Sequence, residues 1–399
     1  MKNKYFLVAL IILVLTMPTI KAFADKIYKI YEEDEIYGEY EYYIEDGNAI
    51  IRRYHGNDEF LVIPSSINGY PVTRLFESAF ENCSSIKSVI IPISVVVIDR
   101  KAFDHCLNLE SVTIPDSVTS IGERAFLYCK SLTTVTIPKS VTSIGWSAFA
   151  YCDNIESANI LCDFTSRAMF SGCIALKTVN LSENATIIDL DTFSFCDSLT
   201  SIIIPESVTY IAHDAFFGCH NLEEIIFLNP ETEFEENSDF SLKADPKEAT
   251  FFGTDKLSTI YAFSGTKAEK FAIKNNKNFI QIANVSLNGE KLKFDMPPII
   301  QKGRTLVPMR AIFEALGAEV SWDDATQTVT ATATDKSITV QIGNPQIQVN
   351  GEPIKLDVPP QIVKDRTLVP VRAIGESFGA TVDWDDATQT VIINGGIKA

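Results

Sequence analysis

The residues best suited to chemistry in this sequence are its eight cysteines, because a thiolate can bind a metal, act as a nucleophile or form a disulfide. Seven of them recur at an interval of 23 residues, with one step of 21. Paired CxxC motifs are absent from the sequence, so a zinc site is not expected. The ladder consists of Cys83, Cys106, Cys129, Cys152, Cys173, Cys196 and Cys219.

The fixed period indicates a stacked repeat, in which these cysteines lie on neighbouring rungs. Paired strands are about 4.8 Å apart, which lies inside the Cα range of a disulfide. Side chains in register, however, keep their Cβ atoms beyond the separation of about 3.8 Å that a disulfide prefers. We therefore predict a structural ladder of buried thiols that pack as small apolar groups. Cys162 falls outside the period and is predicted to be the exposed or reactive thiol.

Two other groups of residues suggest metal or acid–base chemistry. His213 and His220 flank Asp214, but the repeat places both histidines at variable positions that we expect to be exposed. Asp323-Asp324 and Asp385-Asp386 could hold calcium, and they also fit turns between strands. The sequence shows no Ser-His-Asp order, glycine-rich phosphate loop or paired-carboxylate motif. We predict no catalytic residue, no metal site and no cofactor, and expect that the protein is not an enzyme.

The elements that position these residues repeat with the cysteines. In one row Leu132, Val135 and Ile137 alternate with polar residues, which predicts a short strand with one buried face. Pro138 ends that strand, because proline cannot continue a ladder of hydrogen bonds. Ala125-Phe126 precedes the cysteine and is expected to fill the interior. Since one row cannot bury its own apolar face, we predict that the rows stack around one continuous core.

One row reads Ile137-Pro138-Lys139-Ser140-Val141-Thr142-Ser143-Ile144, continues through Ala148-Phe149 and ends at Cys152 and Ile155. This phrase resembles the BspA-type leucine-rich repeat of bacterial surface proteins. The resemblance implies a curved leucine-rich-repeat solenoid of short stacked parallel strands that binds other molecules and does no chemistry. We assign residues 63–283 to it, with a helix near Thr266 and a final strand that close the solenoid.

The first residues have the pattern of a secretory signal peptide. Lys2 and Lys4 precede an apolar run from Tyr5 to Met17, and Ala22-Phe23-Ala24 offers small residues for cleavage before Asp25. The apolar run is too short for a comfortable membrane span. We therefore predict a signal peptide at residues 1–24 and a secreted, extracellular protein with no transmembrane segment after cleavage.

Three stretches depart from the regular repeat. Residues 25–62 are acidic and rich in tyrosine, and we interpret them as a hairpin, turning at Asp46-Gly47-Asn48, that caps the first rung. A ligand site of aromatic and acidic residues is the alternative. Asn68-Gly69-Tyr70-Pro71 is expected to loop out at one edge, and the row around Cys162 to be locally irregular. Residues 229–251 are expected to form a long acidic loop.

A second duplication, offset by 62 residues, begins near Asn284. Arg304-Thr305-Leu306-Val307-Pro308-Met309-Arg310 matches Arg366-Thr367-Leu368-Val369-Pro370-Val371-Arg372, and Ser321-Trp322-Asp323-Asp324 matches Asp383-Trp384-Asp385-Asp386. This pattern resembles the copper amine oxidase N-terminal-like domain, and we assign residues 284–399 to a small duplicated α+β domain. The copper chemistry of the family's namesake needs three histidines, whereas the four of this chain all precede the domain. The resemblance implies a stalk-like accessory module, common on secreted Gram-positive proteins, that aids attachment to the cell envelope.

The remaining functional surface is the outward face of the repeated strands, where small hydroxyl side chains recur. This polar face is the candidate partner-binding face, and a merely solvated strand face is the alternative. The column consists of Ser88, Ser111, Thr134, Ser157, Thr178 and Ser201.

The net charge of −18 argues against nucleic acid and anionic membranes as partners, since both need a basic face. We predict a non-enzymatic binding protein on the surface of a Gram-positive bacterium. Its solenoid would contact a protein or glycan on a cell surface or matrix, as in adhesion, and its C-terminal domain would associate with the cell wall. The alternatives are an envelope scaffold that binds the producer's own wall, and an accessory or inhibitor of a co-secreted enzyme.

Overall fold

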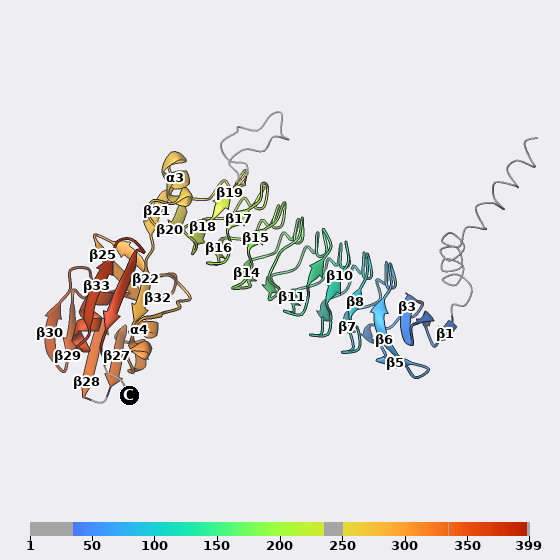
Figure 1. Cartoon of the computed structure of the whole chain (residues 1–399), viewed down its shortest axis with the longest axis horizontal. Coiled ribbons are helices and arrows are strands. Elements are labelled where there is room, and N and C mark those ends of the chain that lie inside the picture. Colours follow the sequence, from blue (N-terminus) through green and yellow to red (C-terminus); the bar gives the residue numbers. More distant parts are fainter. Residues whose placement is uncertain (1–34, 235–249, 334, 397–399) are drawn as a thin grey trace, which may run out of the picture. The chain divides into compact units, whose positions relative to one another are not determined.

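The computed structural model describes residues 35–234, 250–333 and 335–396 (Figure 1). The predicted signal peptide and most of the predicted loop at 229–251 lie outside these residues. The chain divides into two compact units. The first contains Met1–Thr200, Tyr210–Leu222 and Phe234–Asp255, and the second contains Ser201–Thr209, Glu223–Glu233 and Lys256–Ala399.

Short parallel strands form the rungs of the first unit, so the predicted stacked-strand solenoid is confirmed. Ser88 pairs with Ser111, and Ser157 pairs with both Thr134 and Thr178, which puts equivalent positions of the repeat in register. One line of strands consists of β4 (Phe60–Val62), β7 (Ser88–Ile90), β9 (Ser111–Thr113), β11 (Thr134–Ile137), β13 (Ser157–Ile160) and β14 (Thr178–Leu181). The other consists of β8 (Val97–Ile98), β10 (Ser120–Ile121), β12 (Ser143–Ile144), β15 (Ile187–Ile188), β17 (Tyr210–Ile211) and β19 (Glu233–Phe234).

A stack of phenylalanine rings forms the centre of the first unit. The rings of Phe80 and Phe103 are 4.8 Å apart and within 9° of parallel, and Phe126 follows at 5.1 Å and 5°. Offset stacking of this kind adds to the free energy gained by burying the rings. The stack consists of Phe80, Phe103, Phe126, Phe149, Phe170, Phe193, Phe216 and Phe251, all buried.

The residue before each ladder cysteine turns the chain through the left-handed region of φ. Asn82 and His105, for example, have φ of 63° and 59°. At Gly172 a Cβ would also lie 2.5 Å from a ring carbon of Tyr151. Glycine is therefore required there both for its backbone conformation and for the close approach of the neighbouring rung.

The ladder cysteines are free thiols, and the six that follow Cys83 are buried and hydrogen-bond to the preceding rung. The Cys106 thiol donates to the carbonyl of Phe80 at 3.1 Å, and later cysteines repeat this bond at 3.0 to 3.3 Å. The prediction that Cys162 is exposed is wrong, because it is fully buried and its thiol donates to the Phe164 carbonyl. Cys83, at the start of the ladder, is the partly exposed thiol.

An antiparallel hairpin covers the first rung, as predicted. Its strands are β2 (Tyr40–Glu45) and β3 (Asn48–Tyr54), with β1 (Glu35–Tyr37) added at the edge. The turn uses positive φ at Asp46 and Gly47. Tyr42 serves the fold: it is fully buried, and its hydroxyl accepts a hydrogen bond from Asn68 at 2.7 Å.

The insertion at Asn68-Gly69-Tyr70-Pro71 forms a hairpin, so the prediction of a loop there is wrong. β5 (Ser66–Ile67) pairs with β6 (Tyr70–Leu75), and β6 also joins the sheet between β3 and β8. Ile67 and Val72 are fully buried. The insertion therefore supplies a strand because its apolar residues have a core to enter.

The irregular row around Cys162 is confirmed. The sheet that contains β8, β10 and β12 ends at β12, and the next strand of this line is β15. Side chains replace the missing backbone bonds: the Thr165 hydroxyl donates to the Ile187 carbonyl at 3.3 Å and accepts from the Asp189 amide at 2.9 Å.

The last rungs belong to the second unit. Their parallel strands are β16 (Ser201–Ile204), β18 (Glu224–Phe227), β20 (Thr259–Ala262) and β21 (Asn278–Gln281). The predicted helix is α3 (Lys267–Lys274), and its N-cap Thr266 accepts from the Glu269 amide at 3.2 Å. The Glu269 carboxylate in turn accepts from the Gly265 amide at 2.5 Å, which makes a capping box that reaches one residue further out than usual.

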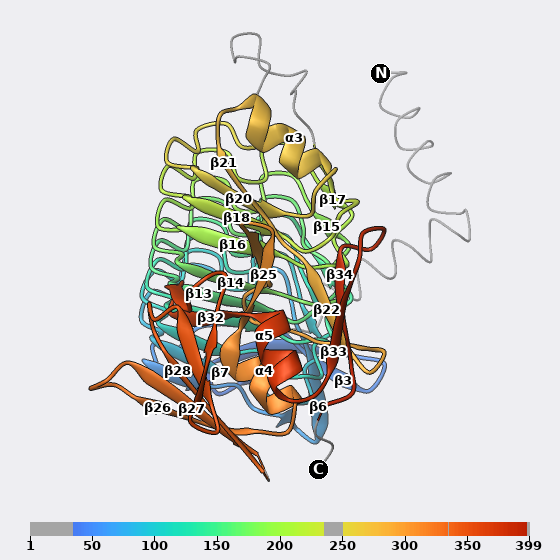
Figure 2. The same cartoon turned by 90° about the vertical axis from the view of Figure 1, so that its left-hand side faces the viewer.

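The duplicated domain is built around two equivalent strands. Val307 of β25 pairs with Val369 of β32, its counterpart 62 residues on. Helices α4 (Met309–Ala315) and α5 (Val371–Ser377) lie beside each other (Figure 2), with the rings of Phe313 and Phe378 5.8 Å apart. Gly317 and Gly379 follow the two helices with positive φ. The strands are β22 (Asn284–Leu287), β23 (Glu290–Lys291), β24 (Ile299–Gln301), β25 (Arg304–Pro308), β26 (Glu319–Asp323), β27 (Thr328–Ala333), β28 (Lys336–Gln341), β29 (Gln346–Val349), β30 (Glu352–Lys355), β31 (Gln361–Val363), β32 (Arg366–Pro370), β33 (Thr381–Asp385) and β34 (Thr390–Asn394).

Candidate functional site

The predicted hydroxyl column lies on the outward face of its strands. Ser111, Thr134, Thr178 and Ser201 are exposed, while Ser88 and Ser157 are partly buried. In the part of the chain that the structure describes, none of these six hydroxyls has a hydrogen-bond partner. The first five lie in the first unit, and Ser201 lies in the second. Within the first unit, the column therefore offers donors and acceptors that the fold itself does not use.

A line of amides runs beside this column. The Asn180 side chain donates to the Asn159 side chain at 2.7 Å, and Asn159 reaches Thr136 at 3.5 Å. This ladder fixes the amides in one orientation, because each bond joins neighbouring rungs. The strand face is therefore polar on β11, β13 and β14, and hydrogen bonds between rungs hold its side-chain amides in place.

The first rungs of the same face are apolar, which the sequence reasoning missed. Phe60, Val62 and Ile90 are 72%, 64% and 52% exposed. Phe60 pairs with Ser88, so the apolar side chains continue directly into the hydroxyl column. The signal was available in the sequence, since Phe60-Leu61-Val62-Ile63 is apolar on both faces of a strand instead of alternating.

In the second unit, two strand residues of the last rungs are covered by the duplicated domain. Ile226 and Tyr261 are buried against Leu306 and Leu368. The Gln389 side chain also forms two hydrogen bonds with the backbone of Ser264. It accepts from the Ser264 amide at 2.9 Å and donates to the Ser264 carbonyl at 2.8 Å. The last rungs and the duplicated domain therefore share one core.

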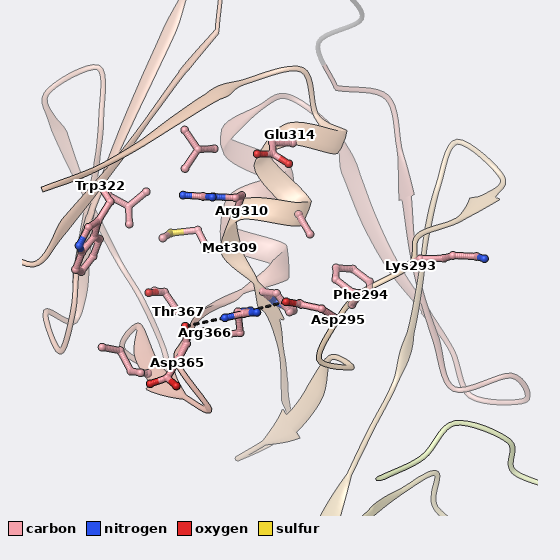
Figure 3. A pocket seen from close by; sticks show the side chains of 15 residues that line it. Lys293, Phe294, Asp295, Met309, Arg310, Glu314, Trp322, Asp365, Arg366 and Thr367 are labelled. Carbon is pink, nitrogen blue, oxygen red and sulfur yellow. Dashed lines mark hydrogen bonds and ion pairs between the residues drawn. The ribbon is translucent and has the colours of Figure 1, made fainter. Parts of the chain in front are cut away.

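Two cavities in the duplicated domain form a second candidate site, which the sequence reasoning also missed. Pocket A has a volume of about 710 Å³, and pocket B about 330 Å³. Figure 3 shows pocket A, with Arg310 and Met309 on α4 and Trp322 on a neighbouring strand. Pocket A is lined by Met309, Arg310, Trp322, Ile362, Arg366 and Thr367, and pocket B by Val371, Arg372, Trp384, Ile300, Arg304 and Thr305.

The two pockets are equivalent under the duplication, because each of these lining residues has its counterpart 62 positions away. Each pocket takes its helix and tryptophan from one copy and its second arginine from the other. In pocket A, Arg366 donates to Asp295 at 2.5 Å, and in pocket B, Arg304 donates to Asp357 at 2.6 Å. The sequence contained a signal for these pockets, because arginines and tryptophans recur at matched positions of the two copies. These residues were interpreted only as evidence for the duplication.

The paired aspartates form turns, in agreement with the turn interpretation. Asp323 accepts from the Ala325 amide at 2.9 Å, and Asp385 accepts from the Ala387 amide at 2.9 Å and the Thr388 hydroxyl at 2.8 Å. Hydrogen bonds from a threonine side chain, Thr326 for Asp323 and Thr388 for Asp385, are the main cause that lowers the pKa of each carboxyl group. The bonds from the Ala325 and Ala387 amides lower the two pKa values further. No group of three or more potential metal ligands is found among the described residues.

The histidines are separate from one another. His213 is partly buried beside Asp214, with which it bonds at 3.0 Å, so the expectation that it is exposed is wrong. His220 is exposed, as expected, and contacts Asp255 at 3.0 Å. Neither histidine is brought to the hydroxyl column or to the two pockets.

In the described residues, no helix is long and apolar enough to cross a membrane.

Comparison with known families gives two matches that adjoin along the chain. The model of the copper amine oxidase N-terminal domain, a non-catalytic domain, matches residues 286–393. The model of the BspA type leucine rich repeat region matches residues 59–169 and 165–290, in six copies. Among curated proteins, none matches the chain.

Several solved structures are similar to part of the chain. A leucine-rich repeat protein of T. pallidum is 24% identical, with 61% of this chain and 95% of that chain covered and a TM-score of 0.39. A leucine rich cell surface protein of Faecalibacterium prausnitzii is 21% identical, covers 61% and 97%, and has a TM-score of 0.25. A leucine-rich repeat protein of Bacteroides capillosus is 30% identical, covers 38% and 99%, and has a TM-score of 0.29.

The repeat model spans residues 59–290, which is more than half of the chain, and its rungs are those that the structure contains. The chain therefore belongs to the family of BspA-type leucine-rich repeat proteins, and it carries a copper amine oxidase N-terminal domain at its C-terminal end.

Proposed function

We propose that this is a secreted, non-enzymatic binding protein of the bacterial cell surface, whose strand face contacts a protein or glycan ligand. The observation that carries the proposal is the hydroxyl column of the first unit: Ser88 pairs with Ser111, Ser157 pairs with Thr134 and Thr178, and these hydroxyls have no hydrogen-bond partner in the described residues. The exposed Phe60, Val62 and Ile90 extend this face with apolar area. An apolar patch beside polar groups is the usual composition of a protein interface.

The duplicated domain would associate with the cell envelope in this proposal. Support comes from the family, because BspA-like leucine-rich repeat proteins are bacterial surface proteins. The domain's fixed attachment to the last rungs, through Gln389 and the shared core, suits a module that holds the repeat region at a surface.

A solid-phase panel of matrix proteins and surface glycans tests the proposal. We expect the full-length protein to bind at least one member, and Thr134→Arg to reduce that binding at least tenfold by placing a long cation in the column. Ser143→Arg is the matched control, since Ser143 is also exposed but lies on β12, in the other line of strands. No binding to any member, or equal losses for the two variants, would contradict the proposal.

A further inference from the structure

The two equivalent pockets of the duplicated domain are lined by arginine and tryptophan side chains whose exposure the fold does not explain. We propose that pockets A and B each bind a carboxylate-bearing sugar, so that the domain holds an acidic glycan at two points. This inference rests on the proposed association of the domain with the envelope and names the chemistry of that contact.

The first argument is an arginine in each pocket that the protein does not use. In the described part of the chain, the side chains of Arg310 and Arg372 have no hydrogen bond or ion pair. Both side chains are exposed and line a pocket wall. The second arginines differ, because Arg366 and Arg304 are each held by an aspartate. An unpaired guanidinium can bind a carboxylate through two parallel hydrogen bonds.

The second argument is a tryptophan that is fixed by the same device in both pockets. The Trp322 indole N–H donates to Asp324 at 3.1 Å, and that of Trp384 donates to Asp386 at 2.6 Å. Trp322 nevertheless remains 40% exposed. With the N–H satisfied, the ring offers an apolar surface on which the C–H face of a sugar can pack.

The third argument is that each pocket also presents acceptors. Glu314 and Asp365 line pocket A, and Asp383 and Asp386 line pocket B. In Figure 3 Glu314 and Arg310 both extend from α4, and Asp365 lies beside Arg366. A simple anion would be repelled by these carboxylates, whereas sugar hydroxyls can donate to them. A ligand with one carboxylate, several hydroxyls and an apolar ring face matches all three features.

Isothermal titration of the full-length protein with a trimer of galacturonic acid tests this inference. The fully methyl-esterified trimer is the matched probe, because it keeps the ring and loses only the charge. Titrations are made at about 0.15 M salt, where charges more than about 8 Å apart are largely screened, so that the net charge of −18 does not dominate. We expect two sites per chain for the acid and binding at least about tenfold weaker for the ester.

Arginine variants assign the sites. We expect Arg310→Ala and Arg372→Ala each to remove one site, and the double variant to remove both, with the thermal midpoint unchanged because neither guanidinium has a partner to lose. Lys355→Ala is the control, since it removes an exposed cation of the same domain that lines neither pocket. Equal binding of acid and ester, wild-type binding by the double variant, or no heat with either probe would overturn the inference.

Binding of the same proteins to purified cell walls separates this inference from the proposed function. If the wild type binds the acid trimer through the two arginines but does not bind walls, the inference about the pockets is supported and the proposed association with the envelope is contradicted. If the double variant binds walls as well as the wild type does and neither protein binds the trimer, the envelope role stands and the inference about the pockets fails.

Discussion

At the scale of single residues, the thiols show how position in a rung decides reactivity. Burial removes the ladder cysteines after Cys83 from solvent, and each of these thiols already donates to a phenylalanine carbonyl of the rung before it. Cys83 begins the ladder and is partly exposed. The thiolate is the reactive form, and burial disfavours it.

Thiol labelling at neutral pH should therefore distinguish Cys83 from the rest. We expect a maleimide to modify one thiol quickly in the folded protein, and all eight in denaturant. Cys83→Ala should abolish the fast phase, whereas Cys162→Ala should leave it unchanged. Fast labelling that depends on Cys162 would show that the irregular rung opens in solution.

The same burial predicts how stability depends on pH. Burial raises the pKa of the Cys219 thiol from its ordinary value of 9.0 to about 12. Above pH 9 the unfolded state releases this proton and the folded state keeps it, so the stabilisation is complete below pH 9 and is lost as pH rises toward 12.

Urea denaturation at several pH values under reducing conditions measures this loss. Between pH 9 and 12 the wild type should lose up to about 1.4 kcal/mol more per pH unit than Cys219→Ala, because one thiol fewer titrates in the variant. Other groups, such as lysines, titrate equally in both proteins and cancel in the difference. Identical slopes would show that the thiol ionises as readily in the folded protein.

The sequence predicted the period of the repeated residues well, but it predicted the burial and bonding of single residues less well. The ladder period placed seven cysteines in register, but it could not show that Cys162, outside the period, is also buried. Arg310 and Arg372 were visible as matched residues. Their lack of a partner is a fact of three-dimensional structure and could not be read from spacing.

At the scale of elements, each rung gains its stability from its neighbours, as expected for a solenoid. Phe126 illustrates this, because its ring is in contact with those of Phe103 and Phe149 on the two adjacent rungs. Removing one ring leaves a cavity between two stacked neighbours.

Phe126→Ala should accordingly lower the free energy of unfolding by about 3–5 kcal/mol. Thr134→Ala, on the exposed face, should change it by less than about 0.5 kcal/mol. Urea denaturation followed by circular dichroism measures both. A loss below about 1 kcal/mol for Phe126→Ala would mean that the stack can close around the gap.

The elements that sequence predicted best were those with local signals. Alternation predicted the strands, Asp46-Gly47 the first hairpin, and Thr266 the start of α3. The hairpin β5–β6 was mistaken for a loop, because Asn68-Gly69 marks a turn equally well in either case. Only the pairing of β6 with β3 and β8 decides between them, and that pairing is a long-range contact.

At the scale of the whole molecule, the sequence indicated the two families correctly but not how the second compact unit is composed. A change of repeat pattern near Asn284 suggests a boundary there, yet Ile226 and Tyr261 share a core with Leu306 and Leu368. These residues are far apart in sequence and have ordinary apolar types. Their contact could not be inferred from any local pattern.

Truncation after Ala283 should therefore damage the repeat region. We expect the shortened protein to unfold at a lower temperature than the full chain and to bind a hydrophobic dye, because Ile226, Tyr261 and Phe263 lose their cover. Gln389→Ala in the full chain is a milder change, which removes only the side-chain hydrogen bonds of Gln389 to Ser264 and Gln281. A truncated protein as stable as the full chain would show that the shared core contributes little.

The most direct test of the central claim is photo-crosslinking from defined positions of the full-length protein. A photoreactive amino acid replaces Thr134, in the hydroxyl column, or Ser143, exposed on the other line of strands. Each protein is illuminated on the panel member that the wild type binds. The account predicts crosslinks to the ligand from position 134 and few or none from position 143. Crosslinks from position 143 alone would contradict it, because the ligand would then lie on a different face of the solenoid.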